Sequence, residues 1–382
     1  MQSEQLVEDL QSAFLSKRIA AIKALSAGKS PDETTAPSCV SVHYRSVYSG
    51  FDYTPSMAAY KALKSGATAA GLIDYASLAG AKEFAAACKA AGVAYYLGTG
   101  IKTDFEGKRL NLLALGVPAG EVKAMHKSLA AARALKAKRV NLLRESINAK
   151  CGKFRLYLPP TLKIFKKSKA DSAENLYKAL AEKIARSYAD ETAIKTFLTE
   201  KLGFNLSEED GEKLSDKNSA LYLSDLATVL REGLGFKDMR EKVAPAQEFV
   251  CSAKKFGAIP AAIYDGSPAD DFFARAKKLG VKCVCVEPDK QTIDLRAFYD
   301  KAISAGILPL ARKVIDRPRK KVVEPQLDEE TFALYTECSL AVCGHQISVD
   351  LSRCDGMFSE KTVNSLPDLK ARIKLFSKIS EG

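Results

Sequence analysis

Residues 39–100 read CVSVHYRSVYSGFDYTPSMAAYKALKSGATAAGLIDYASLAGAKEFAAACKAAGVAYYLGTG. Apolar runs rich in β-branched and aromatic residues, at 40–42, 70–73 and 93–97, alternate here with Ala-rich segments that are typical of helices. The order strand, helix, strand, helix, strand makes consecutive strands parallel, because each helix returns the chain to the same end of the sheet. The stretch therefore predicts an α/β fold built on parallel strands.

The sequence also predicts where the first of these helices begins and ends. Thr54 offers a capping hydroxyl immediately before Pro55, and proline is favoured at the first helical position. Gly66 follows the last apolar turn, and glycine commonly ends a helix. We therefore expect a helix over residues 55–65.

Polar residues or glycine follow each of the three predicted strands. They are His43 and Arg45 after the first strand, Asp74 and Tyr75 after the second, and Thr99 and Gly100 after the third. In open α/β sheets and barrels, functional residues lie at the carboxyl ends of parallel strands, which meet at one face. We expect one pocket to be surrounded by His43, Arg45, Asp74, Tyr75 and Gly100.

Three short motifs in this stretch carry a resemblance to a known family. They are His43-Tyr44-Arg45-Ser46-Val47-Tyr48-Ser49, Asp74-Tyr75-Ala76 and Gly98-Thr99-Gly100. Their order resembles the signature of the polymerase and histidinol phosphatase (PHP) superfamily of metal-dependent phosphoesterases, which is H-x-H-T-x-Y-S, then D-H-D, then G-x-E. The resemblance covers residues 39–345 and implies a distorted (β/α)7 barrel, which is a TIM-like fold.

Most metal-binding positions of that signature differ in this chain. The resemblance places Arg45, Tyr75 and Gly100 where the family has metal ligands, and Lys313 where it has an acid after the seventh strand. The whole chain has three histidines, which are His43, His126 and His345. His43 and Asp74 are the vestigial metal-ligand candidates.

The other two histidines have structural interpretations. His126 is expected to be a surface or packing residue inside a long helix. His345 follows an apolar segment and is expected at the C-terminal end of its helix, where a cation suits the dipole. A role in the pocket is the alternative for His345.

The remaining pattern divides the chain into four predicted parts. These are an N-terminal helix and connector (1–38), the barrel (39–118 and 244–345), a helical insertion (119–243) and a C-terminal tail (346–382). The insertion lacks a convincing strand and is too long for a loop. The resemblance implies that it is a lid over the pocket, and a packing annex is the alternative. The later barrel strands are expected at 111–117, 257–264, 281–287 and 307–310.

Composition limits the partners. The formal net charge of +12 favours contacts with polyanions, yet basic and acidic residues alternate along most helices and no nucleic-acid-binding motif is present. Nucleic acid is thus a possible partner that no sequence motif supports. No apolar run approaches the roughly 18 residues of a membrane span, and residues 1–10 are too polar for a signal peptide. We expect a soluble, cytoplasmic protein with no membrane partner.

Cysteine usage points to a reducing environment. The nine cysteines are an odd number, are scattered through predicted strands and helices, and include no CxxC pair. Reduced core thiols are therefore expected in place of a disulfide framework or a zinc site. Cys283 and Cys285 lie two residues apart on one strand, so they share a face of the barrel wall.

Basic residues also follow the seventh predicted strand. The resemblance places Lys313 and Val314 where the family has its acidic pair, and Arg312 directly precedes them. If the side chain of Arg312 or Lys313 points inward with Arg45, fixed positive charge takes the place of metal ions. A guanidinium group binds phosphate or carboxylate in bidentate fashion without a metal. A solvated basic loop is the alternative.

These observations favour a pseudoenzyme of the phosphoesterase family. It would have lost the metal centre, would need no cofactor, and would bind a small anionic or phosphorylated ligand without hydrolysis. The predicted ligand-binding residues are His43, Arg45, Asp74, Tyr75, Arg312 and Lys313. The alternative is a metal-dependent phosphoesterase with a reduced site. In that case His43 and Asp74 would be catalytic and would hold one divalent metal such as Zn, Mn or Fe.

Overall fold

The computed structural model describes residues 2–27, 40–157, 172–236, 243–288, 293–316 and 327–381. The chain forms two compact units. The first contains residues 1–48, 52–132 and 243–382, and the second contains residues 49–51 and 133–242. The boundary near residue 132 lies inside helix α6 (Ala130–Lys150), so the first turn of α6 belongs to the first unit.

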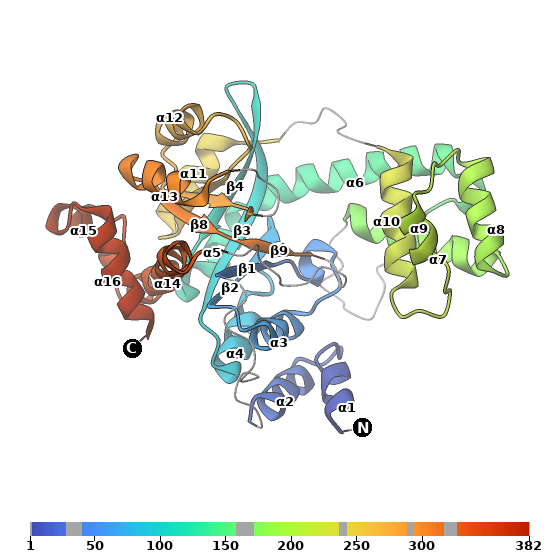
Figure 1. Cartoon of the computed structure of the whole chain (residues 1–382), viewed down its shortest axis with the longest axis horizontal. Helices are drawn as coiled ribbons and strands as arrows, with labels where there is room; N and C mark the ends of the chain where they lie inside the picture. The colour runs from blue at the N-terminus through green and yellow to red at the C-terminus, as the bar shows by residue number, and fades with distance from the viewer. Residues whose placement is uncertain are drawn as a thin grey trace. The chain divides into compact units, whose positions relative to one another are not determined.

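The first unit is built on a sheet that nearly closes into a barrel (Figure 1). In order of hydrogen bonding, its strands are β8 (Leu308–Ala311), β7 (Cys283–Val286), β6 (Ile259–Ile263), β4 (Lys108–Leu115), β3 (Tyr95–Phe105), β2 (Ala69–Tyr75), β1 (Ser41–Tyr44) and β9 (Lys313–Ile315). Only Arg312 separates β8 from β9, and this stretch pairs with β7 on one side and β1 on the other. The predicted TIM-like α/β barrel is confirmed.

One strand of the barrel runs against the others. β4 is antiparallel to both of its neighbours, β3 and β6, whereas the remaining pairs along the sheet are parallel. The sequence prediction ended the third strand before Thr99, and this is wrong, because β3 continues to Phe105 and turns through Glu106-Gly107 into β4. Gly100 therefore lies within a strand. The short strand β5 (Ala244–Pro245) pairs with the far end of β3.

Helices cover the outside of this barrel. They are α1 (Gln2–Asp9), α2 (Leu15–Ser26), α3 (Pro55–Ser65), α4 (Ala81–Ala91), α5 (Val122–Ser128), α11 (Ala246–Lys255), α12 (Ala269–Leu279), α13 (Leu295–Ser304), α14 (Glu329–Leu351), α15 (Glu360–Ser365) and α16 (Leu369–Glu381). The predicted start of α3 is confirmed, since the Thr54 hydroxyl accepts a hydrogen bond from the Met57 amide. The helix ends before Gly66, as expected.

The C-terminal segment is part of the barrel unit. The sequence prediction made 346–382 a tail, but α14 extends to Leu351 and α16 packs along it. Leu369, Ile373 and Phe376 of α16 are buried in the same apolar core as the strands. None of the helices within the described residues is both long and apolar enough to cross a membrane.

The second unit is helical across its described residues. Its elements are the main part of α6, α7 (Ala173–Ser187), α8 (Glu191–Thr196), a π-helical turn (Phe197–Lys201), α9 (Glu208–Lys213) and α10 (Tyr222–Leu234). They enclose a separate apolar core, which includes Ile147, Leu180, Leu198 and Leu226. This core is independent of the one that supports the barrel.

Candidate functional site

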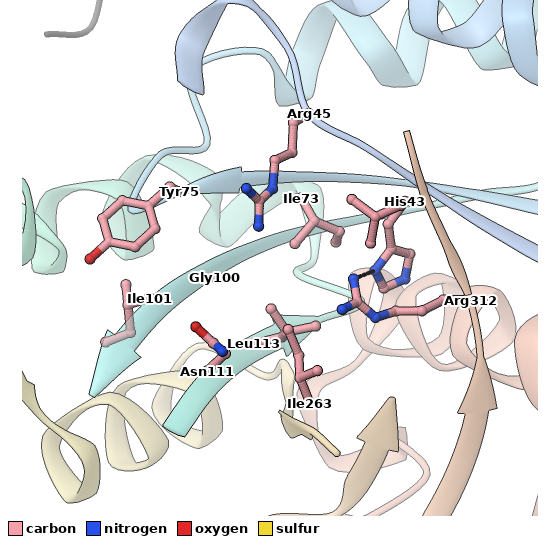
Figure 2. A pocket seen from close by; sticks show the side chains of 11 residues that line it. His43, Arg45, Ile73, Tyr75, Gly100, Ile101, Asn111, Leu113, Ile263 and Arg312 are labelled. Atoms are coloured by element: carbon pink, nitrogen blue, oxygen red, sulfur yellow. Dashed lines mark hydrogen bonds between the residues drawn. The ribbon is translucent and has the colours of Figure 1, made fainter. Parts of the chain in front are cut away.

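A small cavity lies within the barrel unit, where β1, β2 and β8 end (Figure 2). Its volume is about 30 Å³. The polar side chains that line it are His43, Arg45, Tyr75, Asn111 and Arg312, and the apolar ones are Ile73, Ile101, Leu113, Ile263 and Val314. Gly100 lies at its wall. In Figure 2 the guanidinium groups of Arg45, from above, and Arg312, from the right, both point into this space.

The structure brings together most of the residues that the sequence predicted for a pocket, but not all of them. His43, Arg45, Tyr75 and Arg312 line the cavity, whereas Asp74 and Lys313 do not. The reason is the two-residue period of a strand, because the side chains that precede and follow each of these two residues face the cavity. The Asp74 carboxylate instead accepts hydrogen bonds from the amide (2.7 Å) and the hydroxyl (2.6 Å) of Ser46.

His43 lies in a row of paired residues across three strands. The register pairs His43 of β1 with Gly71 of β2, and Gly71 with Tyr96 of β3. A Cβ atom at Gly71 would lie 2.5 Å from the Tyr96 ring, so only glycine leaves room for this ring above β2. The Tyr96 hydroxyl consequently reaches His43 Nε2 at 2.7 Å and the Ser41 hydroxyl at 2.6 Å.

The neighbours of His43 define its tautomer. Arg312 Nη1 lies 3.3 Å from His43 Nδ1, and a guanidinium group can only donate, so Nδ1 accepts. The proton of a neutral imidazole then resides on Nε2 and is donated to the Tyr96 oxygen. Both ring nitrogens of His43 are therefore in use.

Electrostatics keep this imidazole uncharged. The His43 side chain is buried, and burial holds its pKa well below its ordinary value because the charged form loses its hydration. The positive charges of Arg312 and Arg45 lower the pKa further. His43 is thus a neutral hydrogen-bonding residue at physiological pH.

Arg312 is buried but incompletely bonded. Its Nη2 donates to Glu287 Oε1 at 2.6 Å, which forms an ion pair whose arginine side chain is 4% exposed. Its Nη1 donates to His43, and its Nε has no hydrogen-bond partner among the described residues. A water molecule, an ion or a ligand can supply the partner of such a buried donor.

Arg45 supplies the second guanidinium group. It follows β1, its backbone amide donates to the Ile315 carbonyl, and its side chain is half-buried. Burial lowers the pKa of Arg45, and Arg312 lowers it further, whereas the carboxylates of Asp316, Asp74 and Glu287 raise it. The side chain stays charged at neutral pH, since arginine is not deprotonated in proteins.

The two remaining histidines lie outside this cavity. His126 lies in α5, and its Nδ1 accepts from the Leu78 amide at 3.1 Å. The prediction that His345 ends its helix as a cation is wrong, because α14 continues to Leu351. His345 Nε2 donates to the Gly257 carbonyl and Nδ1 accepts from the Met357 amide, and burial lowers its pKa to about 4.

Among the polar residues of the site, sequence reasoning missed Ser41, Tyr96, Asn111 and Glu287. Tyr96 lies in the row of His43 and also contacts the Ser41 hydroxyl, whereas Glu287 holds Arg312. Glu287 is a charged residue at the end of the sixth predicted strand (281–287), and this position was a signal for it. Nothing in the sequence distinguished Tyr96 from its aromatic neighbour Tyr95, because the role of Tyr96 depends on strand register.

The structure also places the cysteines. The described ones are free thiols, and Cys88, Cys151, Cys283, Cys285, Cys338 and Cys343 are buried. Cys39 and the run from Arg317 to Lys321 lie outside the described residues. Within the described part of the chain, no group of three or more His, Cys, Asp or Glu residues is placed to hold a metal ion.

Comparisons with known proteins support the fold. The sequence matches no protein-family model and no curated protein. The structure is similar to an amidohydrolase from Chromobacterium violaceum that holds sulfate and no metal (TM-score 0.50, 14% identity), covering 78% of this chain and 96% of that one. It is also similar to a candidate metal-dependent phosphoesterase from Bifidobacterium adolescentis (TM-score 0.54, 14% identity), covering 76% of this chain and 94% of that one. The chain thus has the fold of these hydrolase-type proteins.

Proposed function

We propose that this barrel protein, related to the PHP phosphoesterases, has lost their metal centre and binds a small anion without hydrolysing it. The observation that carries the proposal is that Arg45 and Arg312 line one cavity while the imidazole beside them is neutral. An anion between the two guanidinium groups would relieve their mutual repulsion and give the Arg312 Nε a partner. This is the chemistry of an anion receptor.

The donor atoms of this cavity do not fit a divalent metal ion. His43 Nδ1 already accepts from Arg312, and its Nε2 carries a proton toward Tyr96. A metal ion here would lie beside two guanidinium groups, and at an effective dielectric constant of about 20 each pair of like unit charges 4 Å apart costs about 4 kcal/mol. The residues present therefore do not fit a metal centre.

The alternative is a hydrolase with one metal held by His43 and Asp74. It would require His43 to release Arg312, and Asp74 to turn from Ser46 toward the cavity. The sulfate in the structurally similar amidohydrolase is compatible with a small anion as the ligand of this barrel.

Thermal unfolding tests the receptor. At least one of sodium sulfate, phosphate and acetate, compared with sodium chloride at equal ionic strength, should raise the melting temperature of the wild type by mass action. Arg45→Gln should lose the response to whichever anion acts. Arg275→Gln, which changes another half-buried arginine in an ion pair, should keep it. If all anions act like chloride, the proposal fails.

Metal analysis tests the absence of a metal centre. Protein incubated with zinc, manganese or iron and then desalted should retain well under one metal per chain. Retention of one or two metals per chain, with phosphatase turnover that His43→Ala abolishes, would establish the hydrolase instead.

A further inference from the structure

The charges around the cavity are nearly balanced before any ligand enters. Two guanidinium groups face the space, but Glu287 is ion-paired with Arg312. Asp316, Asp74 and Glu287 also stabilise the charged form of Arg45. These carboxylates do not line the cavity. The site therefore presents positive hydrogen-bond donors whose charge is offset by nearby carboxylates among the described residues.

The size and lining of the cavity restrict the ligand further. Its volume of about 30 Å³ holds two water-sized groups, since one water needs about 10–15 Å³ of such space, and this suits the two oxygens of one carboxylate while the rest of the ligand lies along the wall. The apolar side chains of Ile73, Ile101, Leu113, Ile263 and Val314 form the rest of the wall. In Figure 2 Leu113 and Ile263 lie beside the Arg312 guanidinium, so an apolar surface adjoins the charged donors.

The residues nearest the open strand ends add little charge. The Tyr75 hydroxyl lies 3.5 Å from the Lys102 amide and accepts from it, so this tyrosine contributes its ring to the wall. Asn111 adds a neutral carboxamide to the same wall. A ligand would therefore meet donors at one end and uncharged surface along its body.

We propose that the anion is a small monocarboxylate with a short apolar chain, and not a phosphate monoester. This inference rests on the proposed function and narrows it. A carboxylate carries one negative charge and is planar, so it suits two guanidinium groups that are already partly neutralised. A phosphate monoester carries about −1.5 to −2 charges at pH 7, which is more negative charge than these partly neutralised guanidinium groups would balance.

A homologous series of ligands tests the inference. Dissociation constants for formate, acetate, propionate, butyrate, methyl phosphate and inorganic phosphate are measured by thermal shift and calorimetry at pH 7.5 and constant ionic strength. Each methylene group that becomes buried should tighten binding about fourfold until the chain outgrows the cavity. Methyl phosphate should bind at least tenfold more weakly than propionate.

The outcomes are distinguishable. If methyl phosphate or phosphate binds as tightly as propionate or more tightly, the carboxylate inference is overturned while the anion receptor stands. If neither class binds, the proposed function itself fails. Equal affinity for formate, acetate, propionate and butyrate would also overturn the inference, because the apolar wall would then play no part.

A cavity variant supplies an independent test. Ile263→Ala removes apolar volume from the wall and should move the optimal chain length up by one or two carbons. Ile303→Ala, a half-buried isoleucine in α13 that does not line this cavity, is the matched control and should leave the optimum unchanged. Each variant is compared with its own unliganded melting temperature, so a loss of stability alone does not affect the result. If the optimal chain length is unchanged in Ile263→Ala, the ligand chain does not lie against Ile263 and the proposal is contradicted.

Discussion

The barrel unit contains two buried arginine–glutamate pairs that differ in one respect. Arg18 of α2 donates Nε and Nη2 to the two oxygens of Glu83 in α4, at 2.7 and 2.6 Å, and Nη1 to the Ser12 carbonyl. Glu83 also accepts from the amide and hydroxyl of Ser56. Every donor group of this guanidinium has a partner, so the pair fastens three helices together.

Arg312 and Glu287 form the other pair, and it is incomplete. One nitrogen reaches Glu287, one reaches a neutral histidine at 3.3 Å, and Nε has no partner among the described residues. A second cation, Arg45, lies on the same cavity. The difference indicates that a completed pair serves stability, whereas an incomplete pair beside a cavity leaves bonding capacity for a ligand.

The largest expected effect concerns the completed pair. Arg18→Met leaves the Glu83 carboxylate buried without its counter-charge, so the free energy of unfolding should fall by about 3–5 kcal/mol. Urea unfolding followed by circular dichroism measures this change. Lys17→Met, whose ion pair with Asp9 is half-exposed, is the control and should cost less than about 1 kcal/mol.

The second prediction concerns the incomplete pair. In the absence of anions, Arg312→Met should lower the free energy of unfolding by only about 1–2 kcal/mol. The substitution breaks one ion pair, but it also removes a donor without a partner and the repulsion between Arg312 and Arg45. The same urea unfolding measures it. A larger loss of stability than in Arg18→Met would show that Arg312 is chiefly a structural residue, and the two ion pairs would then not differ in role.

The third prediction separates the two pairs by ligand linkage. At ten times its dissociation constant, a bound anion should add about 1.4 kcal/mol to the stability of the wild type. Arg18→Met should keep this gain although it is less stable, and Arg312→Met should lose it. Unfolding curves with and without propionate provide the comparison. Equal gains in both variants would mean that the anion binds elsewhere.

The smallest expected effect is a pH dependence that arises beside Arg312. His43 stays neutral in the folded protein because its pKa is depressed, whereas in the unfolded chain it takes up a proton near pH 6.5. The unfolded state then binds more protons, so stability should fall by about 0.8 kcal/mol from this residue between pH 7.5 and 6. His345 contributes in the same direction as the pH falls from about 6.5 towards its folded pKa of about 4.

His43→Gln should therefore have a shallower pH slope than the wild type, without becoming flat. Urea unfolding at pH 7.5, 6.5 and 6 measures the slopes, and each protein is compared with itself at pH 7.5. A slope equal to that of the wild type would mean that folded His43 takes up a proton as readily as the unfolded chain does.

The sequence by itself determined the features that depend on neighbours along the chain. The alternation of apolar strands and Ala-rich helices in 39–100 predicted an α/β fold on parallel strands, the family resemblance implied that these form a barrel, and Thr54 predicted the start of α3. Polar residues placed after strands predicted that His43, Arg45, Tyr75 and Arg312 face one cavity. The two-residue period of a strand, applied more strictly, would also have separated Asp74 and Lys313 from that set.

The tertiary structure decided what depends on pairing between distant strands. His43 meets Tyr96 only because the register places Gly71 between them, and it meets Arg312 only because the last strand stretch closes against β1. These contacts join residues 53 and 269 positions apart. Local propensity cannot specify them, since a shift of one residue in register would turn every side chain to the opposite face of the sheet.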